Sequence, residues 1–315
     1  MRPLHTAAEE YLALRRGLGV TSRTPAALLR RFVAFVEAAD RDVITRELAV
    51  QWAMLPATAQ PATWAWRLGI VRRFAAWRQA ADPQTEVPPA GLLPHRYHRR
   101  RPYVYRDDEI ASLLATARRL PSPRGLRALT YTTLFGLLAA AGLRISEALN
   151  LDRADLHFDA ALLTIRRTKF GKSRLVPLHP STIDALRGYD AARDRVHPHP
   201  GTPAFFVSER GRRLTGDSAR HTFAVVSHQA GLRRSSPGRR HGRGPRLHDL
   251  RHRFAATTLL QWYRAGRAVE RDLPLLATYL GHVHVQDTYW YLEALPDLLT
   301  TVATRLSRPC PERLP

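Results

Sequence analysis

A stretch that cannot form a regular helix lies between residues 82 and 104 and divides the chain. It contains the pairs Asp82-Pro83 and Pro88-Pro89, and proline interrupts helices because it lacks a backbone N–H. The stretch ends in a basic run at residues 95–101. We therefore predict a helical domain at residues 1–90, a basic linker at 91–104 and a second domain at 105–315.

The first domain is predicted to be helical because its apolar residues recur at spacings of three and four. Thr24 and Pro25 are typical of a helix start, with Thr24 as the N-cap and Pro25 in the first helical position. The last of these helices has an apolar stripe formed by Trp66, Ile70, Phe74 and Trp77. The predicted helices cover residues 7–14, 24–39, 45–52 and 63–80.

The second domain is predicted to be mainly helical, with one segment in which the spacing of apolar residues is typical of strands. Residues 126–141 are apolar on most sides and predict a buried helix, which Gly142 ends, while Ser146 is a candidate cap for the next helix. Apolar residues at 162–165 and 175–178 predict two strands of an antiparallel hairpin. The fold class is therefore mainly α, with a mixed α+β second domain. Helices are also predicted from 107, at 182–193, 215–230, 247–260, 275–280 and 296–306, and a short strand at 205–207.

The composition limits the kinds of partner, metal site and cellular compartment to be expected. The formal net charge is +22 and the pI is about 11.3, which predicts a polyanionic partner because neutralised phosphates release counterions. Ribosomal proteins, membrane-surface proteins and nuclear factors share this bias. The single cysteine, Cys310, excludes an internal disulfide and argues against a thiolate zinc site. We see no signal-peptide pattern, and the longest apolar stretch, Leu134–Leu143, is too short to span a bilayer, so we expect a soluble cytoplasmic protein.

Two basic segments of the second domain are candidate ligand sites. Residues 233–246 are rich in arginine, glycine, serine and proline without an apolar residue, which predicts a loop that is mobile or ordered by nucleic acid. The helix that follows opens with His248 and Arg251, which face one side of its N-terminus, a natural place for a phosphate. Arg144 lies between apolar neighbours at a turn and either pairs with a buried acid such as Glu147 or faces a ligand.

The segment at residues 281–292 places His282 at the end of a helix and Tyr291 further along. Phosphoryl transfer needs positive charge on the non-bridging oxygens, a nucleophile, and an acid for the departing alkoxide. Only about 0.1% of a free tyrosine is phenolate at pH 7, but nearby guanidiniums favour the anion and a histidine can take the proton. Tyrosine attack conserves the phosphodiester energy in a covalent bond, so rejoining needs neither ATP nor a metal.

The motifs that carry these residues resemble the tyrosine recombinase, or phage integrase, family. They are AGLRISEAL at 141–149, TKFGKSRLVPL at 168–178, HDLRH at 248–252 and LGH at 280–282, followed by Tyr291. The resemblance covers about residues 103–293. It implies the integrase catalytic fold there, while the N-terminal helices resemble the family's SAM-like core-binding domain more loosely.

The resemblance also implies roles for individual residues. Arg144 and Arg251 would clamp the scissile phosphate, Lys169 would be the general acid, His248 and His282 would assist proton transfer, and Tyr291 would form a 3′-phosphotyrosine. Glu147 resembles the acidic residue that braces the first arginine. Lys172 competes with Lys169 and Tyr289 with Tyr291, but the spacing from Val176-Pro177 favours Lys169, and the spacing from the Leu-Gly-His histidine favours Tyr291.

The predicted function is therefore site-specific recombination, of the integrase or transposase type, on double-stranded DNA and without a cofactor. We expect a homotetramer on paired sites, with the helix at 296–306 docking on a neighbouring subunit. The alternatives are a non-catalytic DNA-binding protein derived from a recombinase and a type IB topoisomerase that works as a monomer. A metallohydrolase built on His248, His252, His282 and His284 is a third alternative, but it lacks an acidic ligand at a matching spacing.

Overall fold

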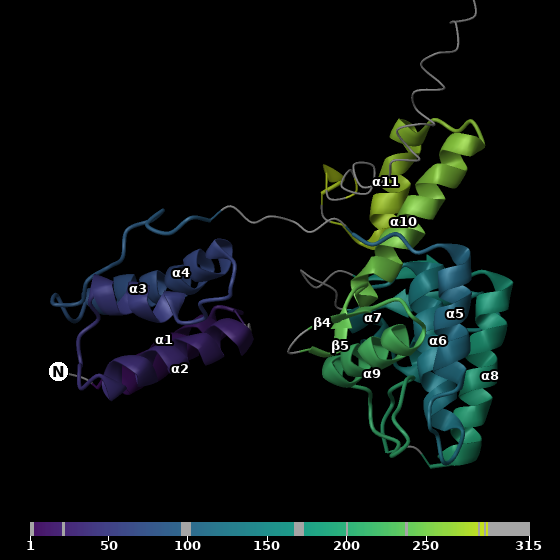
Figure 1. Ribbon diagram of the computed structural model, residues 1–315, viewed down its shortest axis with the longest axis horizontal. Coiled ribbons are helices and arrows are strands. Elements are labelled where there is room, and N and C mark those ends of the chain that lie inside the picture. The colour runs from purple at the N-terminus through teal and green to yellow at the C-terminus, as the bar shows by residue number, and fades with distance from the viewer. Residues whose placement is uncertain are drawn as a thin grey trace, which may run out of the picture. The chain divides into compact units, whose positions relative to one another are not determined.

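The computed structural model of the chain describes residues 3–20, 23–95, 102–166, 173–199, 201–236, 239–282, 284–286 and 288. The chain divides into two compact units, Met1–Arg100 and Arg101–Pro315 (Figure 1). Within the described ranges, no helix combines the length and the apolar character needed to cross a membrane.

The first unit is a bundle of helices around one apolar core (Figure 1). Phe32, Trp52 and Phe74 lie at its centre and are almost completely buried. The third helix begins as the sequence predicts, because the Thr45 hydroxyl accepts a hydrogen bond from the Leu48 N–H at 3.2 Å. The helices are α1 (Leu4–Gly17), α2 (Arg23–Ala38), α3 (Arg46–Met54) and α4 (Pro61–Gln79).

Two details of the first unit differ from the prediction. α2 begins at Arg23, so Thr24 lies inside the first turn and is not the N-cap; Pro25 is tolerated there because first-turn N–H groups have no intrahelical acceptor. Trp66 is 45% exposed. The buried face of α4 is centred between Phe74 and Val71, which places Trp66 beyond its edge.

A buried ion pair at the end of α4 was not predicted from the sequence. Arg78 is buried because its Nε donates to the Asp82 carboxylate at 3.1 Å, and Thr85 donates to the same carboxylate at 3.0 Å. The chain that follows continues along the first unit, where Val87 and Leu93 pack against its core. Residues 82–93 are therefore part of the first unit and not an open connection.

The second unit contains a large helical core and a smaller projecting helix pair (Figure 1). α5, α6 and α8 lie side by side, and α10 passes from contact with α6 into a pair with α11. α6 has the predicted bounds and ends at Gly142 in the left-handed conformation. The helices are α5 (Asp107–Arg118), α6 (Leu126–Ala141), α7 (Ile145–Asn150), η1 (Arg153–Asp155), α8 (Pro180–Val196), α9 (Gly216–Gln229), α10 (Leu247–Arg264) and α11 (Val269–Leu280).

A small antiparallel sheet packs on this core, in the order β1-β2-β3. Its strands are β1 (Leu156–His157), β2 (Leu162–Ile165) and β3 (Arg174–Pro177), so the predicted hairpin is present. Leu163 pairs with Val176, and both side chains are buried. The predicted strand at 205–207 is absent; its Val207 makes only an isolated bridge to Arg213, because neighbouring backbone groups bond to loops instead.

The arginine-rich segment after α9 forms a second antiparallel ribbon, β4 (Arg234–Ser236) and β5 (Arg239–Arg243), so the prediction of a loop is wrong. Arg233 closes the ribbon by donating to the carbonyl oxygens of His241, Gly242 and Pro245 at 2.8, 3.0 and 3.0 Å. The pattern of apolar residues could not predict this ribbon, because its strands contain none. The hydrogen bonds of the Arg233 side chain stabilise the ribbon in place of apolar packing.

Candidate active site

Arg144 stands at the start of α7, and Glu147 holds it there. The Arg144 backbone N–H donates to Oε2 of Glu147 at 2.9 Å, and its Nη1 donates to Oε1 at 2.8 Å. The helix therefore begins at Ile145 with Arg144 in the N-cap position, and the predicted cap, Ser146, lies inside it. Glu147 fills the role of the cap from within the first turn, where a carboxylate also favours the helix dipole.

Arg251 lies on α10 and is only 1% exposed. Its Nη1 donates to the Gly142 carbonyl at 2.8 Å, and its Nη2 donates to the Leu280 carbonyl at 2.7 Å. These carbonyls belong to the C-terminal ends of α6 and α11, where the last C=O groups lack intrahelical partners and carry the negative end of the helix dipole. The two helix ends thus hold the buried guanidinium.

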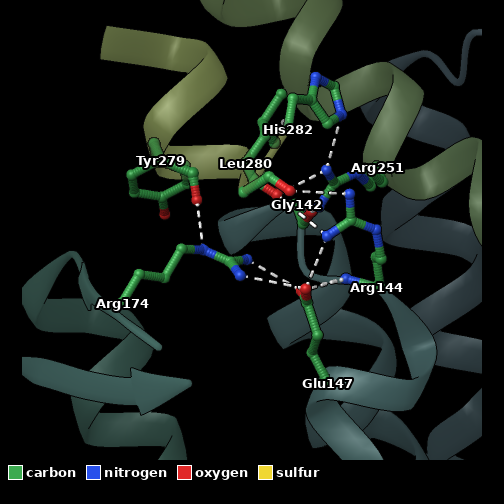
Figure 2. A network of polar contacts seen from close by, with 9 residues as sticks. Gly142, Arg144, Glu147, Arg174, Arg251, Tyr279, Leu280 and His282 are labelled. Carbon is green, nitrogen blue, oxygen red and sulfur yellow. Dashed lines mark hydrogen bonds and ion pairs between the residues drawn. The ribbon is translucent and has the colours of Figure 1, made fainter. Parts of the chain in front are cut away.

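Arg144 meets Arg251 at the same helix end. Its Nη2 donates to the Gly281 carbonyl at 3.1 Å, and its Nη1 approaches the Leu280 carbonyl at 3.4 Å (Figure 2). The Leu280 carbonyl oxygen therefore accepts from both guanidiniums. Segments 136 residues apart in the chain, at Arg144 and Leu280, come together at this point.

His282 completes the group from the residue after the helix cap. Its Nε2 lies 2.9 Å from Nη2 of Arg251, and its Nδ1 lies 2.8 Å from the Thr288 hydroxyl. A guanidinium can only donate, so Nε2 accepts and the ring proton is on Nδ1, which donates to Thr288. This arrangement assigns a neutral imidazole to His282.

Arg174 was not among the residues singled out from the sequence, yet it joins this network (Figure 2). It donates to both carboxylate oxygens of Glu147, at 3.1 and 2.9 Å, and to the Tyr279 carbonyl at 2.8 Å. A signal for it exists: strand alternation puts Arg174 on the same face as the buried Val176, and a charged residue on a core-facing strand position needs a partner.

The network is electrostatically suited to an anion. Burial by itself raises the pKa of Glu147, but the hydrogen bonds and charges of Arg174 and Arg144 more than offset it, so the pKa is lowered and the carboxylate stays ionised. The charged side chains drawn in Figure 2 are then one carboxylate, Glu147, and the three guanidiniums of Arg144, Arg174 and Arg251. The positive charge exceeds the negative charge, which favours binding of a phosphate.

His248 lies in the first turn of α10, one turn before Arg251. Its ring stacks edge-on against His252, with centroids 4.7 Å apart, and the side chain remains exposed. The pKa of His248 is lowered, first because the surrounding protein partly removes water from the imidazole and then because of the positive charge of Arg251. The charges of Arg246 and Arg144 lower it further, and the charge of Asp249 opposes them. His248 is therefore placed beside the arginines as a neutral group, without a direct bond to them among the described contacts.

The other predicted site residues, Lys169 and Tyr291, lie outside the residues that the structure describes, as do Lys172, Tyr289 and the helix predicted at 296–306. In the described ranges, no group of three or more histidine, cysteine, aspartate or glutamate side chains is arranged to hold a metal ion.

The chain is similar to known proteins over most of its length. Residues 104–297 match the phage integrase family. The Sinorhizobium fredii protein y4rB, named as an integrase/recombinase, is 50% identical over 313 residues, with 98% of each chain covered. The tyrosine recombinase XerC of Mycobacterium leprae is 30% identical over 93% of this chain and 95% of its own.

Solved structures share the fold. The XerH site-specific recombinase bound to its palindromic difH substrate has a TM-score of 0.62 at 19% identity, covering 97% of this chain and 84% of that chain. The Tn1549 transposon integrase in complex with transposon right-end DNA has a TM-score of 0.63 at 15% identity, covering 96% and 99%. These likenesses confirm the predicted fold class. The chain belongs to the phage integrase family and is a tyrosine recombinase.

Proposed function

We propose that this protein is a site-specific DNA recombinase that cleaves a strand through Tyr291 and rejoins it to another end. The observation that carries the proposal is that Arg144 and Arg251 both donate to the Leu280 carbonyl oxygen, and that His282 is bonded to Arg251 beside them. That oxygen occupies a position between two guanidiniums in which a non-bridging phosphate oxygen would be stabilised.

In the proposed reaction the Tyr291 oxygen forms a bond to phosphorus while the bond from phosphorus to the 5′-oxygen breaks. Arg144 and Arg251 stabilise the charge that gathers on the non-bridging oxygens. Lys169 gives a proton to the departing 5′-oxygen. The proton that Tyr291 loses goes to a histidine, His248 or His282. The 3′-phosphotyrosine conserves the energy of the phosphodiester, so a free 5′-hydroxyl of another strand reverses the step without ATP.

Double-stranded DNA is the proposed partner. A formal net charge of +22 fits a polyanion, and the related XerH and Tn1549 integrase structures are complexes with DNA. We further propose a tetramer on paired sites, with residues 296–306 docking on the neighbouring subunit, because exchange between two duplexes needs four cleavages. The role belongs to the integrase or transposase type, as in the relative y4rB and the Tn1549 integrase.

A nicked suicide duplex carrying the end of the element tests the proposal, because loss of the short cleaved fragment traps the covalent complex. Wild-type protein is expected to form protein–DNA adducts that survive denaturation and persist in EDTA. Tyr291→Phe should abolish them and Tyr289→Phe should not. Adducts that persist in Tyr291→Phe, or a wild-type protein that binds this duplex and never forms an adduct, would contradict the proposal.

The choice between Lys169 and Lys172 needs a second substrate. A duplex with sulfur in place of the bridging 5′-oxygen has a thiolate leaving group, which departs without a proton because a thiol has a pKa of about 8.5. We expect Lys169→Ala to be slow on the normal duplex and to recover on the sulfur-containing one. Lys172→Ala is the matched control and should be similar to wild type on both.

A further inference from the structure

Arg174 connects three elements of the active site. Its side chain is 11% exposed, and the residue begins β3, where it pairs with Ile165 at the end of β2. Two of its nitrogens hold the carboxylate of Glu147 in α7, and Nε holds the Tyr279 carbonyl near the end of α11. The strand, the helix that begins beside Arg144 and the helix that ends before His282 are therefore joined through one guanidinium (Figure 2).

The contact with Glu147 determines how Arg144 is held. Oε1 accepts from Nη1 of Arg144 at 2.8 Å and from Nη1 of Arg174 at 3.1 Å, while Oε2 accepts from the Arg144 N–H and from Nη2 of Arg174, each at 2.9 Å. Both oxygens are thus shared between the two arginines. The planar, two-pronged contact of Arg174 fixes the plane of the carboxylate, and a lysine could reproduce only a point charge there.

Arg174 also sets the position of the end of α11. Gly281 ends this helix with φ +68°, and a β-carbon at Gly281 would lie 2.6 Å from Nη1 of Arg174. The guanidinium therefore packs directly under the residue that precedes His282. The carbonyl oxygens of Leu280 and Gly281, which hold Arg251 and Arg144, belong to the same turn.

We propose that Arg174 is a positioning residue for strand cleavage. It orients Arg144 through Glu147 and holds the end of α11 so that Arg144, Arg251 and His282 meet at one phosphate. Arg174 does not itself contact the reacting atoms in this arrangement. The inference rests on the proposed function, because it concerns the same reaction.

The test compares Arg174→Met with wild type on two suicide duplexes, one normal and one with a methylphosphonate at the scissile position. A methyl group in place of a non-bridging oxygen removes the negative charge that the guanidiniums stabilise. If Arg174 orients Arg144, then Arg174→Met lowers the rate of covalent complex formation about 100-fold on the normal duplex and less than tenfold on the methylphosphonate. Arg144→Ala is expected to show the same pattern.

Three further variants keep the test decisive. Leu175→Ala changes the neighbouring, 59% exposed position of the same strand and should cleave both duplexes at the wild-type rate. Arg174→Lys keeps the charge and supports folding if Arg174→Met does not fold; it should show an intermediate loss with the same dependence on the duplex. A Glu147→Gln/Arg174→Met double variant should lose less than the product of the two single effects, because the part of the Arg174 effect that acts through Glu147 is already lost in Glu147→Gln.

The inference is wrong if the Arg174 variants cleave at the wild-type rate, if they lose equal activity on both duplexes, or if the double variant loses the product of the single effects. These outcomes are separate from failure of the proposed function, in which the wild-type protein itself forms no covalent complex on the normal duplex.

Discussion

Nη2 of Arg251 donates a hydrogen bond to Nε2 of His282 across 2.9 Å, so the tautomer of this histidine follows from its neighbour. The ring proton lies on Nδ1, and the buried Thr288 hydroxyl accepts it at 2.8 Å. A protonated His282 could not accept from Arg251. The site therefore holds a neutral imidazole whose Nε2 lone pair points at the arginine that is proposed to bind the phosphate.

We predict that His282 is the Nδ1–H tautomer in DNA-free protein at about pH 8, where an unperturbed imidazole of pKa about 6.5 is also neutral. Nitrogen-15 NMR of the labelled imidazoles measures this directly, with His282→Asn used for assignment. Thr288→Val removes the acceptor and should shift the tautomer equilibrium toward Nε2–H, while Thr288→Ser should preserve it. A dominant Nε2–H signal in the wild type would refute the assignment.

The second prediction concerns His248, whose folded pKa is lowered by its surroundings and by Arg251. A lowered histidine pKa means that the folded state resists protonation, so His248 costs stability below the folded pKa and nothing above the unfolded value. The free energy of unfolding of His248→Asn, relative to that of the wild type, should therefore be higher at about pH 5 than at about pH 8. Thermal melting of both proteins at the two pH values measures it; a difference independent of pH would contradict it.

The third prediction concerns Gly281 and separates the cost of its backbone conformation from its contact with Arg174. Gly281→Ala places a side chain in the left-handed conformation, which costs roughly 1–2 kcal/mol, and also displaces Arg174. Gly231 follows α9 with φ +74° and has nothing within 4 Å of a built β-carbon, so Gly231→Ala is a control for the conformational cost alone. Gly281→Ala should lower the rate of covalent complex formation by roughly tenfold or more, and Gly231→Ala should leave it unchanged.

The fourth prediction concerns the β4–β5 ribbon, where Arg234, Arg240 and Arg243 are exposed and form no ion pair within the part of the chain that the structure describes. If they bind DNA phosphates, replacing all three by Gln should make the slope of log affinity against log salt concentration less steep by about 2–3, since each phosphate contact contributes about 0.9 to the slope. Fluorescence anisotropy at several salt concentrations measures this slope.

The control for the ribbon is Arg195→Gln. Arg195 is exposed on α8, which lies on the opposite side of the second unit from the ribbon, beyond α6 (Figure 1). This variant removes one positive charge without touching the ribbon. A triple ribbon variant that keeps the wild-type salt slope would show that the ribbon does not contact the DNA backbone.

Several local features of this protein were predictable from its sequence. The apolar pattern and Gly142 predict the bounds of α6, the helix predicted at 45–52 is present as α3, and Glu147 was one candidate partner for Arg144, with which it does pair. Each signal acts within a few residues, through helix periodicity, capping or a neighbouring charge. The motifs also identified Arg144, Arg251 and His282, which the structure brings together.

Other features depended on contacts between distant segments. Arg174 meets the Tyr279 carbonyl across 105 positions in the chain, which no local pattern reports. Arg251 is buried because the Gly142 carbonyl, 109 positions away in the chain, and the Leu280 carbonyl accept hydrogen bonds from its guanidinium. The sequence by itself determined which helices form and which charged residues are available. Only tertiary packing decided which buried charges meet, because a buried charge is stable only where a partner from another element compensates its lost hydration.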